Sequence, residues 1–301
     1  MRFLTALLTL SLTASLAEAA LRGPLILDAA IAGDAIVSVG ERGLIQRSTD
    51  GGSTWTAVDS GVPRTLCAIG FADDRNGWAA GHGAIILRTT DGGESWEHQF
   101  TGEDEESPFL DLIALPGGHV IAVGAFGMYY ESHDAGATWE QQWILEEDAH
   151  MNRISQAPDG TLWLAGEFGT LLKSTDQAES WEMLTTGEDG SLYGVLPLTN
   201  GDLLAYGLRG RIYLSTDDGE TWEHSETPGT GLLMTGIELA SAKTILVAGQ
   251  GRTFWTSRDG GRTFTSSGGN TAAIAELLLS PSGQLLVLGE MGAEPAQPFT
   301  P

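Results

Sequence analysis

The chain has 301 residues, of which 40 are acidic and 15 are basic, and its formal net charge is −25. Such an acidic protein repels the phosphate groups of nucleic acids and of anionic lipids, which excludes binding to either by counterion release. The single cysteine, Cys67, excludes an intramolecular disulfide. The 41 glycines suit a protein with many tight turns, and the length suits one domain.

Residues 1–19 have the features of a secretory signal peptide. Arg2 precedes an apolar run from Phe3 to Leu16, and Ala17-Glu18-Ala19 fits a cleavage site. The apolar run is shorter than the roughly 20 residues that a membrane-spanning helix needs. We therefore expect export to the periplasm or secretion, a mature chain of residues 20–301, and no direct membrane insertion after cleavage.

A short box with the form Ser/Thr-x-Asp-x-Gly-x-Thr/Ser-Trp occurs six times, with Ala178 in place of the glycine in the fourth box and Phe264 in place of the tryptophan in the sixth. Its aspartates and aromatic residues are Asp50 and Trp55, Asp91 and Trp96, Asp134 and Trp139, Asp176 and Trp181, Asp217 and Trp222, and Asp259 and Phe264. A second marker, a glycine that ends an apolar run, precedes each aromatic residue by 15 positions. These marker glycines are Gly40, Gly81, Gly124, Gly166, Gly207 and Gly249, and the marker recurs at Gly289.

The repeat length predicts the fold. Successive aromatic residues are 41 to 43 positions apart, and repeats of this length built from strands and tight turns are typical of β-propeller blades. Seven marker glycines predict an all-β, seven-bladed propeller over residues 20–301. Because the last repeat lacks a box, we expect its blade to be incomplete, with two or three strands and an irregular tail at 293–301. A six-bladed ring with a loose tail is the alternative.

Each residue of the box has a structural explanation. The aspartate carboxylate can accept hydrogen bonds from backbone N–H groups two residues on, and the Ser/Thr hydroxyl can add a local bond. The glycine allows a positive φ angle. The tryptophan is expected to lie across the next strand and to seal the blade. We therefore interpret the box residues as fold-making and not catalytic.

The turns after the marker glycines lie on the opposite face of a propeller from the boxes. Their side chains surround the central opening and form the predicted partner-binding face: Glu41, Arg42, His82, Phe126, Glu167, Phe168, Arg209, Gln250, Glu290 and Met291. Aromatic side chains beside charged groups are typical of a protein or peptide site. Phe126 and Phe168 hold equivalent positions in adjacent blades, where they either form an exposed apolar pair or plug the mouth of the channel.

A sialidase or another glycosidase is the enzymatic alternative. A sialidase needs three arginines to hold the substrate carboxylate, and the candidates are Arg64, Arg153 and Arg209. A carboxylate pair for glycoside hydrolysis could be formed by Asp28 and Asp111. Nothing in the spacing marks either group as a set. The six histidines share no ligand spacing, so we predict neither a metal site nor a cofactor.

The box resembles the Asp-box, or BNR, repeat of sialidases and related propellers. The longer string from Val39 to Trp55 is similar to the photosystem II stability/assembly factor family of seven-bladed propellers, and Gly81 to Trp96 matches that family almost as well. The resemblance covers about 26–292. It implies a basic patch of arginines that engages the nascent reaction-centre subunit. The equivalent positions here are Arg47, Arg88, Glu131, Lys173, Leu214 and Thr256, so most of the patch is absent.

Together, these patterns predict an exported, non-enzymatic propeller scaffold. Its role would be protein–protein interaction or the assembly of a membrane complex, as the resemblance to photosystem II assembly factors implies. Its partner would be a protein, such as an envelope membrane complex or a transporter. The alternatives are a sialidase-like or other glycoside hydrolase and a carbohydrate- or peptide-binding module.

Overall fold

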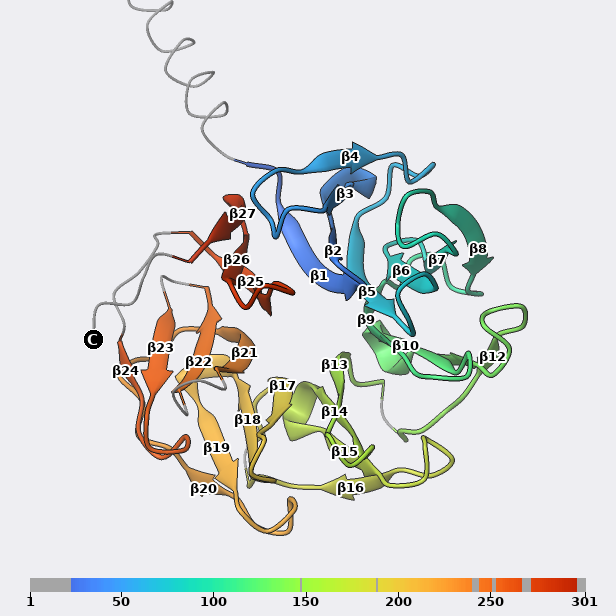
Figure 1. The fold of residues 1–301 in the computed structure, drawn as a ribbon. Helices are drawn as coiled ribbons and strands as arrows, with labels where there is room; N and C mark the ends of the chain where they lie inside the picture. The colour runs from blue at the N-terminus through green and yellow to red at the C-terminus, as the bar shows by residue number, and fades with distance from the viewer. Residues whose placement is uncertain are drawn as a thin grey trace, which may run out of the picture.

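The computed structural model describes residues 23–146, 148–187, 189–239, 244–250, 253–266 and 272–296. These residues form seven antiparallel sheets around a central axis, which confirms the predicted seven-bladed β-propeller (Figure 1). The predicted signal peptide lies outside the described residues. Within those residues, no helix has the length and apolar character that crossing a membrane requires.

Each sheet is a meander in which neighbours in sequence are neighbours in space. Blades 1 and 2 contain β1 (Ile26–Ala32), β2 (Ala35–Gly40), β3 (Ile45–Ser48), β4 (Thr56–Val58), β5 (Leu66–Phe71), β6 (Gly77–Gly81), β7 (Ile85–Thr89) and β8 (Glu97–Thr101). Blades 3 and 4 contain β9 (Phe109–Ala114), β10 (Val120–Gly124), β11 (Tyr129–Ser132), β12 (Glu140–Gln141), β13 (Met151–Gln156), β14 (Leu162–Gly166), β15 (Leu171–Ser174) and β16 (Glu182–Leu184).

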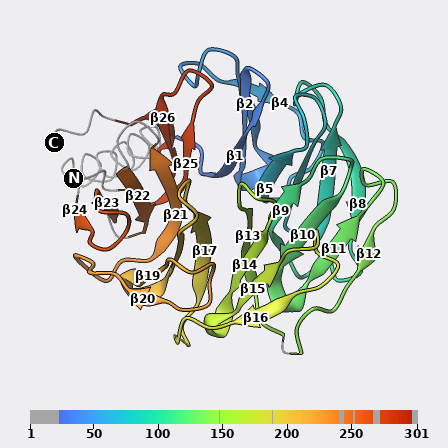
Figure 2. The same cartoon turned by 60° about the horizontal axis from the view of Figure 1, so that its bottom comes forward.

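Blades 5 to 7 repeat the pattern. They contain β17 (Leu192–Pro197), β18 (Leu203–Gly207), β19 (Ile212–Ser215), β20 (Glu223–His224), β21 (Leu233–Leu239), β22 (Thr244–Gly249), β23 (Phe254–Ser257), β24 (Thr265–Ser266), β25 (Ile274–Leu279), β26 (Leu285–Gly289) and β27 (Gly292–Pro295). Short 3-10 turns follow four marker glycines: η1 (Glu41–Gly43), η2 (Ala125–Gly127), η3 (Glu167–Gly169) and η4 (Leu208–Gly210). The first strand of each blade lies nearest the axis, as Figures 1 and 2 show.

The hydrophobic core lies between the blades. The aromatic residue of each box packs against a cluster formed by its own blade and the preceding one. Trp139, for example, packs against a cluster that includes Trp78 of blade 2 and Phe109 of blade 3. Trp55 packs against Leu286 and Leu288 of blade 7, which closes the ring. Burial of apolar surface between neighbours therefore holds the blades together, because each sheet is covered on both faces.

The seventh blade has three strands in the described part of the chain. Its third strand, β27, pairs with β26 through a two-residue turn at Glu290 and Met291. The tail predicted as irregular from residue 293 therefore begins inside a strand, and that boundary was wrong. Three prolines made a strand there improbable, but Pro295 lies at the end of an edge strand, where its missing N–H is tolerated.

The marker glycines are required by a close approach between two strands. A side chain at Gly124 would overlap the carbonyl oxygen of Pro108, the residue before the innermost strand of blade 3. All seven marker glycines face a carbonyl in this way: Gly40 faces Leu25, Gly81 faces Thr65, Gly166 faces His150, Gly207 faces Ser191, Gly249 faces Leu232 and Gly289 faces Ala273. The next residue donates its N–H to the same carbonyl at 2.9–3.1 Å in every blade. A β-bulge in each innermost strand accompanies this contact.

The box turns are closed by a repeated set of hydrogen bonds. In blade 1, the Ser48 hydroxyl donates to Asp50 at 2.8 Å and accepts the Gly52 N–H at 2.9 Å. The same Asp50 oxygen, Oδ1, also accepts the Thr54 N–H at 2.9 Å, and Oδ2 accepts the Thr54 hydroxyl at 2.6 Å. The carboxylate therefore closes a longer turn than expected, because it reaches four residues on and not two. These bonds, led by the Thr54 hydroxyl, lower the pKa of Asp50 to about 2.

We predict that Gly124→Ala will lower the free energy of unfolding by about 1–3 kcal/mol, because the new methyl group must displace a backbone carbonyl. Denaturant-induced unfolding followed by tryptophan fluorescence measures this change. The matched control is Gly70→Ala, also within a strand, where a methyl group would make ordinary contacts of 3.5 Å or more. The control should change stability by less than about 0.5 kcal/mol. Equal effects of the two substitutions would contradict the assignment of the marker glycines.

Candidate functional site

On one face of the propeller, four turns carry bulky side chains at a position whose backbone conformation favours glycine. We call η1, η2, η3 and η4 the rim turns. The central residue of each has a positive φ angle: Arg42 at 55°, Phe126 at 55°, Phe168 at 55° and Arg209 at 59°. The equivalent residue of blade 2 is Gly83, with φ 81°. Residues with a Cβ atom pay roughly 1–2 kcal/mol for this conformation, and glycine does not.

Both phenylalanines of the rim turns are exposed. Phe126 is 57% and Phe168 is 68% exposed, so neither ring plugs the channel. Leu208 of η4 is a third exposed apolar residue, on the next blade. A hollow of about 210 Å³ beside it is lined by Arg209 and Arg211 and by residues 189–192. Blades 3 to 5 therefore carry an apolar strip that ends beside arginines, and we call Phe126, Phe168, Leu208 and Arg209 the rim strip.

Three acidic residues of the predicted partner-binding face are used by the fold. Glu41, Glu167 and Glu290 each follow a marker glycine, and each accepts the backbone N–H at the start of its own blade's innermost strand. The acceptor distances are 3.4, 3.1 and 3.2 Å. These carboxylates stabilise the close approach of the two strands. The exposed residues that remain on this face include Arg42, His82, Phe126, Phe168 and Arg209.

A contact between blades 3 and 4 orders part of the rim strip. The His150 ring packs edge-to-face on Phe126, with 4.8 Å between ring centroids. Its Nδ1 atom lies 3.6 Å from Glu167, which also accepts the His150 backbone N–H. The neighbouring blade thus holds the Phe126 ring in place, so this side chain loses less conformational entropy when a partner binds.

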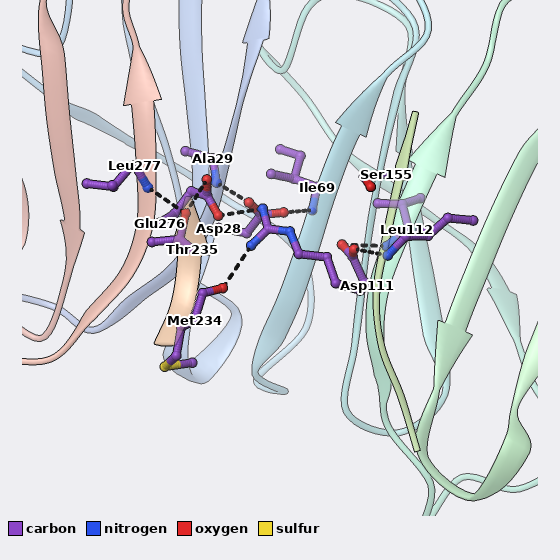
Figure 3. Close-up of polar contacts among 12 residues, drawn as sticks. Asp28, Ala29, Ile69, Asp111, Leu112, Ser155, Met234, Thr235, Glu276 and Leu277 are labelled. Carbon is purple, nitrogen blue, oxygen red and sulfur yellow. Dashed lines mark hydrogen bonds and ion pairs between the residues drawn. The ribbon is translucent and has the colours of Figure 1, made fainter. Parts of the chain in front are cut away.

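Polar residues meet on the axis of the ring, at the position that follows the bulge of each innermost strand. The seven equivalent residues are Asp28, Ala68, Asp111, Arg153, Gly194, Thr235 and Glu276. Three of them tie one blade to the next by accepting a backbone N–H. Asp28 accepts the N–H of Ile69 and Asp111 that of Ile154, both at 2.8 Å, and Thr235 accepts that of Leu277 at 3.2 Å. These interactions are drawn in Figure 3.

Arg153 crosses the axis to blade 7. Its Nη2 atom donates to Glu276 at 2.6 Å and its Nη1 atom to the Met234 carbonyl at 3.3 Å (Figure 3). Glu276 also accepts the Thr235 hydroxyl at 3.1 Å. In blade 5, where the axial residue is glycine, the Tyr206 hydroxyl lies against Gly194 and takes the place of a side chain.

The axial cluster holds three carboxyl groups and one arginine, and burial together with the neighbouring charges shifts the pKa values of Asp28, Asp111 and Arg153. Burial raises the pKa of Asp111 to about 6. Burial and then the Glu276 charge raise the pKa of Asp28. Burial alone would lower the pKa of Arg153, yet Glu276 beside it raises that pKa above its usual value. Burial likewise raises the pKa of Cys67 to about 12, so its thiol stays protonated and unreactive.

The structure does not assemble the arginines of the glycosidase hypothesis. Arg153 is held on the axis by Glu276, and Arg64 lies 4.0 Å from Glu105 in the loop before blade 3. Arg209 belongs to the rim strip, and within the described residues no contact joins the three. Asp28 and Asp111 do share the axial cluster, but both oxygens of each accept backbone N–H groups, which leaves them poorly placed as an acid–base pair.

The basic residues of the third strands brace neighbouring blades. Arg47 donates to the Gly92 carbonyl of the next box at 3.0 Å, and Lys173 pairs with Asp218 of the next box at 2.6 Å. Arg88 packs on the ring of Trp78 at 5.7 Å. Arg47 and Lys173 therefore have structural partners at the positions where the resemblance implies a patch for partner binding.

We predict that the stability advantage of the wild-type chain over Asp111→Asn will shrink as the pH rises from 4 to 7. A carboxyl whose folded pKa is about 6 binds more protons in the folded than in the unfolded chain, so its contribution falls as the pH rises through 6. The full change is at most about 3 kcal/mol. Chemical denaturation at a series of pH values measures it.

Asp134→Asn supplies a control with the opposite sign. Hydrogen bonds from the Thr138 N–H and hydroxyl lower the pKa of this box aspartate, so its stabilising effect is present at neutral pH and is lost as the pH falls below 4. A stability difference for Asp111→Asn that does not depend on pH would contradict the buried, proton-binding role of Asp111.

Comparison with known proteins agrees with this architecture. The family model described as "Photosynthesis system II assembly factor YCF48" matches residues 25–105, 47–142 and 101–235, which together cover well over half of the chain. No curated protein matches the sequence.

Several solved structures share the fold. "YCF48 bound to D1 peptide" matches with a TM-score of 0.73 at 21% identity, over 90% of this chain and 92% of that one. "YCF48 from Cyanidioschyzon merolae" matches with a TM-score of 0.71 at 17% identity, over 89% of this chain and 94% of that one. The GH74 xyloglucanase of Xanthomonas campestris matches with a TM-score of 0.67 at 14% identity, over 90% of this chain but 51% of that one. At these identities the likeness establishes the fold alone, whereas the family model matches the repeats themselves. The chain therefore belongs to the photosynthesis system II assembly factor YCF48 family.

Proposed function

We propose that this protein is an exported, non-enzymatic scaffold that binds an extended segment of a partner protein across the rim strip. The observation that carries the proposal is the positive φ angle of Phe126, Phe168 and Arg209. Glycine would fit these turns without strain, as it does in blade 2, so bulky side chains there cost stability without improving the core. Strained residues held in this way are commonly found at binding sites.

The chemistry of the rim strip indicates the kind of segment. Two exposed phenyl rings and Leu208 offer apolar contacts on three successive blades, and Arg209 lies beside a hollow at the end of the strip. Apolar side chains followed by an acidic residue or a terminal carboxylate would complement this order. A family member of known structure is described as bound to a D1 peptide, which supports peptide binding as the mode of recognition.

An assembly role for a membrane complex follows from the family and from the predicted signal peptide. The family model is that of an assembly factor, and residues 1–19 predict delivery to the periplasm or beyond. The client in this protein would be a protein exposed on that side of the membrane, such as an envelope complex or a transporter. An enzymatic role is not favoured, because both carboxylate oxygens of Asp28 and of Asp111 are engaged by backbone N–H groups.

We predict that the double variant Phe126→Ala/Phe168→Ala will bind the partner segment about 30-fold or more weakly, since truncating two central aromatic contacts removes at least about 2 kcal/mol. The mature chain is used to capture partners from the envelope membranes of its own cells. Captured proteins are identified by mass spectrometry, and peptides from them are titrated by fluorescence anisotropy.

The matched control is Trp143→Ala/Met183→Ala, which removes two apolar side chains that are 70% and 63% exposed and lie outside the rim turns. The control should bind like the wild type. Retention of full affinity by the rim double variant, or an equal loss in the control, would refute the proposed surface.

A further inference from the structure

Two histidines and a glutamate meet on the face that carries the boxes, at blade 3. His119 directly precedes β10, and His133 directly follows β11. Val120 pairs with Ser132, so the two histidines are cross-strand neighbours, and their rings stack with 4.3 Å between centroids. Glu131 lies two residues before His133, on the same side of the strand. Strand pairing thus brings together three side chains that sequence spacing did not connect.

The distances within this group suit a shared ligand. The Nε2 atom of His119 lies 3.5 Å from Glu131 Oε2, and the Nε2 atom of His133 lies 3.6 Å from Glu131 Oε1. The three donor atoms all lie within 4.8 Å of one another. Zinc–nitrogen bonds of about 2.0–2.1 Å in tetrahedral geometry place donor atoms roughly 3.4 Å apart. His133 is 60% exposed at its side chain, so its ring can rotate to complete that geometry.

His119 provides an independent indication of a ligand. It is only 8% exposed, and its buried Nε2 atom has no hydrogen-bond partner among the described residues. A buried polar nitrogen without a partner destabilises a protein, and buried polar atoms are nearly always satisfied by protein, water or a bound group. This nitrogen lies beside the Glu131 carboxylate, where a metal ion would satisfy it.

Among the described residues, blade 3 lacks the contact to the next blade that a basic side chain makes in blades 1 and 4. At the position of Glu131, blades 1 and 4 have Arg47 and Lys173, which bond to the box of the next blade. In blade 3, a hollow of about 320 Å³ separates Glu131 and His133 from the box turn of blade 4. At the position of His133, four of the other five boxes have threonine, and the sixth has Arg258. The fold therefore requires neither Glu131 nor His133 at its position.

We propose that His119, Glu131 and His133 bind one divalent transition-metal ion of the zinc class. Two imidazoles and one carboxylate are the ligands that Zn²⁺ prefers, whereas Mg²⁺ and Ca²⁺ prefer sites made of oxygen atoms. The fourth coordination position faces the hollow toward Trp181 and is open to water or to a donor from another molecule. The site lies on the box face, away from the rim strip, and it does not depend on the proposed function.

Isothermal titration calorimetry of the metal-stripped mature chain with Zn²⁺ tests this proposal. We expect one tight site per chain, and binding at least about tenfold weaker in His133→Ala, because an exposed ligand is lost while the fold is retained. Circular dichroism checks that the variant is folded. His119→Gln and Glu131→Gln should also weaken binding, and Mg²⁺ should produce no saturable heat.

The matched control is His98→Ala, which removes an exposed histidine from β8 of the neighbouring blade. It should bind Zn²⁺ with wild-type affinity. The absence of a saturable site in the wild-type chain would overturn the proposal. So would equal affinities of the wild-type, His133→Ala and His98→Ala chains, because Zn²⁺ would then be held by acidic groups elsewhere on the surface.

Discussion

The structure depends on the close approach of each marker glycine to a backbone carbonyl. At Gly124 and its six equivalents, no side chain fits between the second strand and the start of the innermost strand. The approach allows the next N–H to reach that carbonyl, and it places a bulge in the innermost strand. Because the same contact recurs in all seven blades, every turn beyond it leaves the sheet in the same direction, toward one face.

This contact divides the molecule into two faces with different tasks. The box face is occupied by carboxylate-closed turns whose aromatic residues pack one blade against another. The rim face carries the rim turns, whose central residues have positive φ angles. A strained side chain remains exposed only where the surrounding fold compensates for its cost. The surrounding fold thus offsets the backbone strain of the exposed Phe126 and Phe168. The axial cluster adds rigidity, because it joins opposite blades.

The sequence predicted the features that arise within one repeat. The blade count, the order of strands and the face that carries each turn follow from spacings of 15 and about 42 residues, because a meander pairs only neighbouring segments. It did not predict that Glu41 accepts the backbone N–H of Leu25 and Glu167 that of His150, since those bonds require the register of the bulge. The sequence left open whether blade 7 has two strands or three, because the prolines obscured the pairing of β27. The cluster of His119 and His133 was missed because cross-strand neighbours share no fixed spacing.

The central claim is that the rim turns, and not the box turns, meet the partner. Hydrogen–deuterium exchange of the mature chain, with and without a captured partner peptide, tests it most directly. The account predicts slowed exchange at residues 125–127, 167–169 and 208–210 and unchanged exchange in the boxes. Protection confined to the box turns or to the outermost strands would contradict the account.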